Sequence, residues 1–202
     1  MLFVAPIVEG HGEEAAVPAL LHRIAQQVGG GAGLRVNPPI RIKSGSFLND
    51  SDYFRRYVTL AAEKAKNQDG VVLILLDADD DRHCPATLGP DLLSRAKGVR
   101  GDVPIIVSLA WREYETWFIT AAQSLAGRHG LPPDLQPPPA PDGIRGAKEW
   151  LGQKMASGYD PITHQLNFTK LFDLGQARAN RSFERLCRII ESLSKQHTAP
   201  VK

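Results

Sequence analysis

The sequence predicts an α/β fold in which a mostly parallel, Rossmann-like sheet is flanked by helices. Three short apolar runs, at residues 2–8, 71–76 and 103–110, have the length and composition of buried strands. The segments between them carry apolar residues at helical spacing. Strands that alternate with helices favour a parallel sheet with right-handed crossovers, so this order of segments predicts the fold class.

Each strand is justified by its own residues. The runs at 71–76 and 103–110 are rich in Val, Ile and Leu, as expected for strands buried on both faces. The run at 2–8 contains Pro6, which is unusual inside a strand because proline cannot donate a hydrogen bond to a neighbour. Residues 36–43 are a weaker candidate for a further strand.

Two helices are predicted between the strands, because apolar residues recur there on one helical face. The first face consists of Val17, Leu20, Leu21, Ile24 and Val28. The second face consists of Tyr53, Tyr57, Leu60 and Ala61. Residues 49–51 precede this second face and include possible N-caps.

The last third of the chain differs from the rest in composition. Residues 127–146 contain six prolines and predict a long surface connection without regular structure. The chain as a whole has a formal charge of +2, but residues 143–202 carry ten Lys or Arg against five acids. We therefore expect one compact unit with an α/β core over residues 1–126, a proline-rich connection over 127–146 and a basic helical extension over 147–202.

The extension is expected to end in an amphipathic helix that packs on the sheet. Its apolar face consists of Phe183, Leu186, Ile190 and Leu193. Arginines recur beside this face at near-helical spacing, at Arg178, Arg181, Arg185 and Arg188.

Several classes of protein are disfavoured by composition. Cys84 and Cys187 are far apart and lack a CxxC pattern, so neither a disulfide framework nor a zinc site is indicated. The apolar run at residues 2–8 is too short to cross a membrane and lacks the basic leader of a signal peptide. We therefore expect a cytoplasmic protein without a membrane association.

Acidic residues follow two of the predicted strands. Glu9 directly follows the first strand, and the run Asp77, Asp79, Asp80 and Asp81 follows the strand at 71–76. Ligands bind beyond the carboxyl ends of parallel strands, so Glu9, Asp77 and Asp79 are expected to lie together. Grouped carboxylates repel one another, and Mg²⁺ (or Mn²⁺) is a cation that suits hard oxygen ligands. The alternative is a solvated turn at 77–81 and an ordinary acidic helix start at Glu13.

Two sets of motifs resemble known families. Val8-Glu9-Gly10 and Asp77-Ala78-Asp79, each at the end of a strand, resemble the two signatures of the Toprim domain, which topoisomerases, primases and OLD-type nucleases share. The ordered segments at 9–21, 111–118 and 178–186 resemble an uncharacterised bacterial Toprim-like family that is often encoded beside AAA-type ATPases. This second resemblance extends over nearly the whole chain.

The resemblance implies roles for individual acids. Glu9 would be a metal ligand or general acid/base, and Asp77 and Asp79 would be Mg²⁺ ligands. Glu13 would match the second acid of OLD-like nucleases and take part in catalysis. Glu113 or Glu115 would complete a second metal position. We favour Glu113 because it is nearer to the strand end, and a helix would point the two side chains apart.

Basic and aromatic residues offer further candidates. Lys43, Lys170 and Arg178 could contact substrate phosphates, because an acidic metal centre needs nearby positive charge to hold a polyanion. A solvated basic face is the alternative. Trp111 and Trp117 could stack on bases, but Trp117 is expected to belong to the core.

These observations lead to two functional hypotheses. The first is Mg²⁺-dependent phosphodiester hydrolysis by a nuclease, and the resemblance implies an ATPase partner and a role in defence against foreign DNA. The second is a non-catalytic Toprim-like module that binds nucleic acid, a nucleotide or a protein. The choice between DNA and RNA, the number of metal ions and the oligomeric state stay open at this point.

Overall fold

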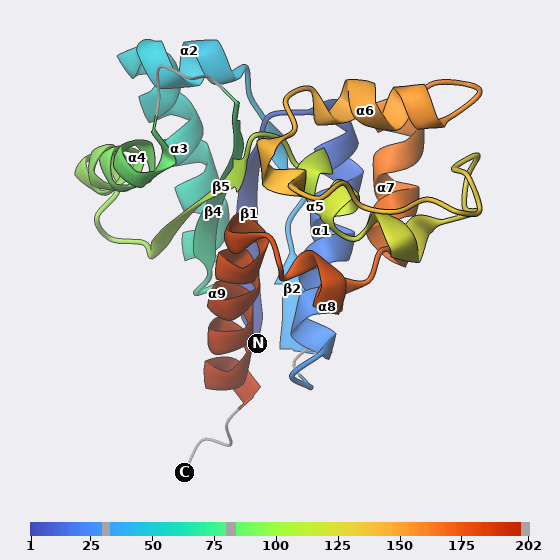
Figure 1. Ribbon diagram of the computed structural model, residues 1–202. Coiled ribbons are helices and arrows are strands. Elements are labelled where there is room, and N and C mark those ends of the chain that lie inside the picture. Colours follow the sequence, from blue (N-terminus) through green and yellow to red (C-terminus); the bar gives the residue numbers. More distant parts are fainter. Residues whose placement is uncertain (30–32, 80–83, 199–202) are drawn as a thin grey trace.

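Five strands form one sheet at the centre of the computed structural model, which describes residues 1–29, 33–79 and 84–198 (Figure 1). The strands are β1 (Leu2–Val8), β2 (Leu34–Val36), β3 (Ile40–Arg41), β4 (Val71–Ala78) and β5 (Ile105–Trp111). Their order is β2-β1-β4-β5, with β3 also paired to β1, and each of these pairs is parallel. The predicted α/β fold with a mostly parallel sheet is confirmed.

The weaker strand candidate is interrupted rather than continuous. Instead of one strand over residues 36–43, the chain forms β2 and β3, separated by Asn37-Pro38-Pro39. This break explains how Pro6 fits into a central strand. The carbonyls of Val4 and Val8 accept hydrogen bonds from Asn37 and Ile42 on that side, so Pro6 faces the gap between β2 and β3. Proline has no amide hydrogen to donate, and the gap opposite Pro6 contains no strand carbonyl that would need one.

Helices cover both faces of the sheet. The longer ones are α1 (His11–Gln26), α3 (Ser51–Lys66), α4 (Pro85–Val99), α7 (Pro161–Leu171) and α9 (Arg181–Thr198). The shorter ones are α2 (Ser44–Asn49), α5 (Glu115–Thr120), α6 (Ala147–Lys154) and α8 (Leu174–Ala177), with 3₁₀ turns at Ala122–Leu125 and Pro141–Gly143. In Figure 1, α3 and α4 lie on one side of the sheet, and α1 and α7 lie on the other.

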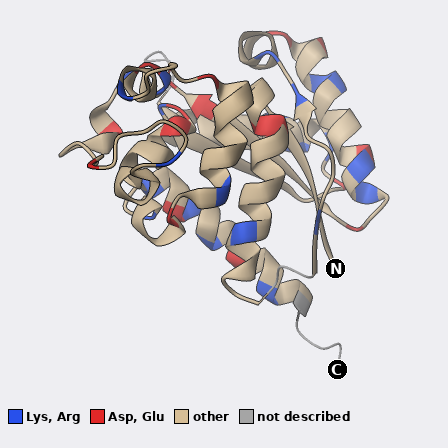
Figure 2. Cartoon of the chain, turned by 90° about the vertical axis from the view of Figure 1, so that its right-hand side faces the viewer, with Lys and Arg blue, Asp and Glu red and all other residues tan. Residues whose placement is uncertain are grey.

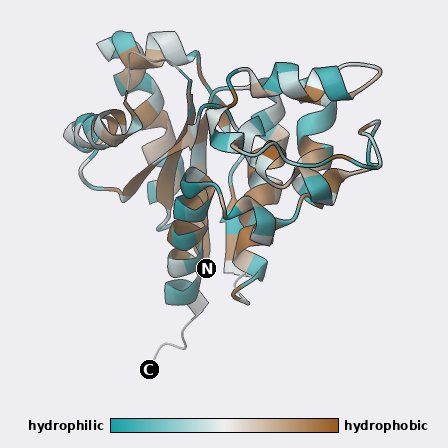
Figure 3. Cartoon of the chain, viewed as in Figure 1, coloured by the Kyte–Doolittle hydropathy of each residue, from teal (hydrophilic) through white to brown (hydrophobic). Residues whose placement is uncertain are grey.

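Alternation along β4 produces two separate cores. Val72, Ile74 and Leu76 pack with the cluster under α3 and α4, whereas Leu73 and Leu75 pack with the cluster under α1 and α9. Because β4 is buried on both faces, it reads as a continuous apolar run. The strands are accordingly among the hydrophobic segments in Figure 3.

The predicted helices form, but the face predicted for α3 is only partly right: Ala61 is buried and Tyr53 and Tyr57 pack against the core. Asp50 caps α3 by accepting hydrogen bonds from the amides of Asp52 and Tyr53, as the sequence suggested. Leu60, however, is 45 % exposed. The buried face of α3 consists of Phe54, Val58, Ala61, Ala62 and Ala65. The small alanines allow the helix to lie close to the sheet. The prediction missed most of this face because it favoured the larger side chains that lie one position earlier in the sequence.

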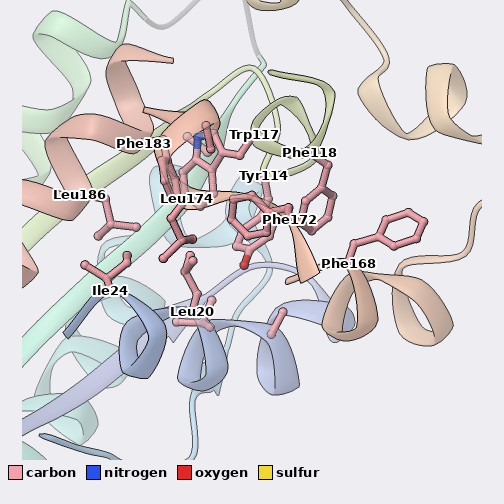
Figure 4. Packing of buried hydrophobic residues seen from close by; sticks show 14 of the residues in the cluster. Leu20, Ile24, Tyr114, Trp117, Phe118, Phe168, Phe172, Leu174, Phe183 and Leu186 are labelled. Carbon is pink, nitrogen blue, oxygen red and sulfur yellow. The ribbon is translucent and has the colours of Figure 1, made fainter. Parts of the chain in front are cut away.

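The C-terminal helices pack against the same face of the sheet as α1. Phe183, Leu186 and Ile190 of α9 are fully buried, and Leu193 packs beside them, so the predicted apolar face is confirmed. Trp117, also buried, contacts the ring of Phe183 with centroids 5.2 Å apart. Figure 4 shows these rings together with residues of α1. The aromatic cluster therefore joins the end of the α/β core to the helical extension.

The proline-rich segment has almost no regular structure, as predicted, apart from the turn at Pro141–Gly143. It still contributes to the core, because Leu131 and Leu135 are each only 4 % exposed. Among the residues that the structure describes, no helix is long and apolar enough to cross a membrane.

Candidate acidic site

Acidic side chains from three segments converge beyond the carboxyl ends of β1, β4 and β5. The parallel register pairs Ile7 with Ile74, and Asp77 with Ala110, so these strands end at the same edge of the sheet. Glu9 follows β1, Asp77 is the penultimate residue of β4, and Glu113 follows β5. The expected proximity of Glu9 and Asp77 is therefore seen in the structure. Asp80 and Asp81 lie outside the described residues.

The loop after β1 is held by two contacts to carboxylates. Glu9 accepts a hydrogen bond from the Ser44 hydroxyl at the start of α2. The backbone amide of Glu9 donates to Glu13 Oε2 at 3.0 Å, much as in a capping box. Glu13 is only 4 % exposed. Its carboxylate thus lies beneath the loop and stabilises the position of Glu9.

Asp77 is fixed by the segment that follows β5. Its Oδ1 accepts a hydrogen bond of 2.8 Å from the backbone amide of Tyr114, and its side chain is 12 % exposed. Beside it, Ala78 and Arg112 form a single antiparallel bridge, and Arg112 has a φ of 66°. This left-handed residue turns the chain so that the segment after β5 reaches Asp77.

Lys148, in the first turn of α6, lies at the centre of the acids. Its Nζ is 2.7 Å from Glu113 Oε2, 2.9 Å from Glu115 Oε2 and 3.4 Å from Asp77 Oδ2. Although 36 % of the lysine side chain is exposed, its partners are nearly or fully buried. These carboxylates raise the pKa of Lys148 against the opposing effect of burial, so its ammonium group is charged.

Glu113 and Glu115 both face this lysine, contrary to the expectation that a helix would point them apart. The reason is that α5 begins only at Glu115, so Glu113 lies in the preceding turn. The remaining oxygen of Glu113 accepts from the Ala147 amide at 2.7 Å. Glu115 Oε1 accepts from the Tyr159 hydroxyl at 2.9 Å and from Gln165 at 3.2 Å. Both carboxylates are therefore already engaged.

The pKa values of the cluster reflect burial and crowding. Burial, followed by the negative charge of Glu13, raises the pKa of Asp77 well above its usual value. Burial, more than the charges of Glu115 and Glu9, raises the pKa of Glu13 to about 7. The pKa of Glu9 is also raised, mainly by burial and further by Asp79, although the Ser44 hydrogen bond opposes this. More negative charge is gathered here than Lys148 alone neutralises.

A solvent-accessible hollow of about 420 Å³ adjoins the cluster. Asp79, Glu113, Arg112, Arg145 and Lys148 all contribute to its wall. Acidic and basic groups thus meet in the same hollow, as a site for a phosphate and a cation would require. Acidic and basic residues also lie close to one another elsewhere in the molecule, as the view in Figure 2 shows.

The predicted phosphate contacts fall in different places. Lys43 directly precedes Ser44 and is exposed beside the Glu9 loop. Arg178 instead forms ion pairs with Glu184 and Glu191 and contacts Gln27, just past the C-terminal end of α1. Lys170 is exposed near the end of α7, next to Thr169, whose carbonyl contacts Arg23 of α1. α1 starts at the acidic edge, and both of these contacts are made toward its other end. The structure therefore brings neither Arg178 nor Lys170 to the acids.

The acids do not form a preassembled metal-binding group. Within the three described segments, no set of three or more His, Cys, Asp or Glu side chains is arranged to hold a metal ion. The available donors are nevertheless carboxylate oxygens, the type that Mg²⁺ prefers, and Mg²⁺ is commonly held by one or two carboxylates together with substrate phosphate. The chemistry of Glu9, Asp77 and Asp79 therefore suits Mg²⁺, whereas Glu113 is occupied by Lys148 and Ala147.

Comparison with protein families assigns the chain as a whole. Residues 8–191 match a family described as Domain of unknown function (DUF4276). The chain belongs to the DUF4276 family. Neither the curated proteins nor the solved structures contain a significant match to it. The DUF4276 match includes every acid of the cluster as well as Lys148, so the site lies entirely within the family domain.

Sequence reasoning missed two residues of this DUF4276 site, Lys148 and Ser44. Lys148 follows the proline-rich segment in a short helix with little amphipathic character, so no local pattern marks it as an ion-pair partner of the acids. Ser44 begins α2, a short helix that was not predicted and that directly follows the strand candidate at residues 36–43. The chain before residue 143 carries more acids than bases, whereas the extension after it is basic. This difference in charge was the signal in the sequence for an ion pair between the two parts, such as that of Lys148 with the acids.

Proposed function

We propose that this protein is a Mg²⁺- or Mn²⁺-dependent phosphodiesterase that acts as a nuclease. The observation that carries the proposal is the convergence of Glu9, Asp77 and Asp79 beside a hollow that also presents Lys148. The excess negative charge of the cluster favours a divalent cation, and its position at the ends of parallel strands is typical of ligand sites. The resemblance of the Glu9 and Asp77-Ala78-Asp79 motifs to Toprim signatures supports the same conclusion.

Each residue then has a defined task. Glu9, Asp77 and Asp79 would hold the metal, and Glu13 positions Glu9 through the loop amide. A divalent ion held there would supply an activated water and would offset charge on the attacked phosphate. Lys148 holds Glu113 and Glu115 in place through its ion pairs, and its exposed part can contact a phosphate oxygen in the hollow. Burial raises the pKa of Glu9, which makes its carboxylate a stronger proton acceptor than an ordinary glutamate.

The rival proposal is a binding module without catalysis. It is favoured by the lack of a preassembled metal-binding group among the described residues and by the ion pairs with Lys148 that already engage Glu113 and Glu115. Such a module would bind a nucleic acid, nucleotide or protein through the same hollow. The two proposals differ in whether removal of an acid abolishes a reaction.

A cleavage assay separates them. Wild-type protein is incubated with plasmid and with labelled DNA and RNA oligonucleotides in Mg²⁺, Mn²⁺ or chelator. Cleavage in metal should fall by orders of magnitude in Glu9→Gln and Asp79→Asn, because each change removes a ligand carboxylate at nearly constant shape. Asp91→Asn is the control, since Asp91 is an exposed acid on α4. Equal cleavage by wild type and Asp79→Asn would indicate a contaminating nuclease.

The wider setting of the activity is part of the proposal. An AAA-type ATPase partner and a role in defence against foreign DNA follow from the resemblance, and a cytoplasmic location agrees with two unpaired cysteines. The assay is therefore repeated with the ATPase and its nucleotide. Metal-independent binding without cleavage under every condition would support the binding module instead.

A further inference from the structure

A second hollow, of about 670 Å³, lies between the start of α4, strand β5 and the start of α9. We call it the β5 cleft. Its apolar wall consists of Val107, Leu109 and Trp111 from one face of β5, with Pro85, Ala86 and Gly89 of α4 opposite. This volume is within the range of small-molecule sites, and the apolar wall suits an aromatic ring system.

Two arginines give the β5 cleft its charge. Arg181 and Arg185 of α9 line it, and neither side chain forms an ion pair or hydrogen bond with a residue that the structure describes. Arg178 and Arg188, the other members of the basic stripe, are ion-paired with Glu184. Asp142 is the acid on the wall, and its carboxylate accepts a hydrogen bond from Asn180. Of these four arginines, the two outside the cleft are therefore neutralised by ion pairs, and the two that line the cleft keep their positive charge.

The β5 cleft adjoins the acidic site through consecutive residues. Trp111 lines the cleft, whereas Arg112 lines the hollow beside Asp79. The Arg112 guanidinium lies 4.7 Å from the centroid of the Trp111 ring, so the two hollows meet at this contact. A chain with regularly spaced phosphates could occupy both at once.

We infer that the β5 cleft binds a nucleotide of the single-stranded nucleic acid next to the phosphodiester that is cut. Its base would lie against the apolar wall near Trp111, and its phosphates would contact Arg181 and Arg185. Residues four apart on a helix differ by about 6 Å in rise and share a face, so the two guanidinium groups can contact neighbouring phosphates. Bases stack on aromatic walls without sequence preference, and this requires unpaired bases. The inference rests on the proposed nuclease function.

Two glycines of α4 provide a matched steric test. A Cβ at Gly89 would be 3.8 Å from Leu109 Cδ1, an ordinary contact, so Gly89→Leu should fold while its side chain fills the cleft. A Cβ at Gly98 would meet nothing within 4 Å, and Gly98→Leu makes the same change in the same helix outside the cleft. Circular dichroism and melting temperature check that both variants are folded.

Binding is measured by fluorescence anisotropy with a labelled single-stranded oligonucleotide in chelator, so that cleavage does not contribute. We expect Gly89→Leu to weaken binding at least tenfold and Gly98→Leu to leave it unchanged. Arg181→Ala/Arg185→Ala should lower the slope of log K against log salt by about 1.4, from about 0.7 for each phosphate contact on a single strand. Arg188→Ala, which removes an ion-paired arginine, should leave the slope unchanged.

Other outcomes would overturn the inference. Unaltered binding by Gly89→Leu and by the double arginine variant would show that the strand lies elsewhere, even if cleavage requires Glu9 and Asp79. Binding of a mononucleotide as tight as that of the strand would assign the β5 cleft to a small nucleotide instead, and preference for the matching duplex would exclude an unpaired base. Cleft-dependent strand binding without cleavage in any metal would retain the inference about binding and reject the nuclease.

Discussion

The ammonium nitrogen of Lys148 lies 2.9 Å from a carboxylate oxygen of Glu115, whose side chain has no exposed surface. This ion pair joins α6 of the helical extension to α5, directly after the sheet. Glu115 also receives hydrogen bonds from Tyr159 and Gln165. The acidic site is thus completed by residues on the far side of the proline-rich connection.

Replacement of Lys148 by Met should destabilise the protein, because Glu115 and Glu113 lose their counter-charge. Loss of one partner of a buried pair costs about 3–5 kcal/mol, and we expect the lower end or less since Lys148 is partly exposed. The loss should be larger at pH 8 than at pH 5, where the carboxyls can take up protons. Urea denaturation at both pH values measures it. Lys154→Met, at an exposed position of the same helix, is the control, and equal losses in both variants would contradict the assigned role.

Glu13 should make the metal-free protein less stable as the pH rises. Its pKa is raised from 4.5 to about 7, so between these values the folded state retains a proton that the unfolded chain has lost. The free energy of unfolding therefore falls across this window, by at most about 3 kcal/mol for this group. Asp77 and Glu115, whose pKa values are also raised, act in the same direction.

Denaturation in chelator at pH 5, 6, 7 and 8 tests the contribution of Glu13. Glu13→Gln should flatten the decline, since glutamine does not titrate and can still accept from the Glu9 amide. Glu14→Gln changes a neighbouring, half-exposed carboxylate and should leave the decline intact. Parallel curves for wild type and Glu13→Gln would show that other groups set the pH dependence.

Gly12→Ala should separate α1 from α7. A Cβ at position 12 would lie 2.5 Å from the Pro161 carbonyl oxygen and even closer to the Gln165 side chain, which binds Glu115. Overpacking of this kind costs about 1–3 kcal/mol. Gly45→Ala is the control, because a Cβ there meets nothing within 4 Å. A melting temperature that is unchanged in Gly12→Ala would mean that the two helices can separate without cost.

The two cysteines should differ in reactivity. Cys84 is exposed, whereas Cys187 is buried and its pKa is raised by burial to about 12. Since the thiolate is the reactive form, a thiol reagent should modify one cysteine in the native protein and both after denaturation. Mass spectrometry of the labelled peptides identifies the site. Rapid labelling of Cys187 without denaturant would reveal opening of the core under α9.

The sequence was informative where structure follows from local pattern. Apolar runs that end in acids predicted the parallel sheet and the meeting of Glu9 with Asp77, because the ends of parallel strands coincide at one edge. Lys148 could not be predicted in this way, since its partners come from β4 and from the segment after β5. Arg178 had the right charge for a phosphate contact, but Glu184 and Glu191 bind it far from the acids. Pairing over such separations depends on packing, which periodicity does not encode.

The position of Lys148 late in the chain has a consequence for protein synthesis. The strands and their acids, through Glu115, leave the ribosome before the lysine that neutralises them and before Tyr159 and Gln165. A nascent chain that has not reached α7 therefore cannot bury Glu115 with its partners. Unfinished or prematurely terminated products would lack an ordered site, so a cell would be exposed to the proposed nuclease only after nearly the whole domain had been translated.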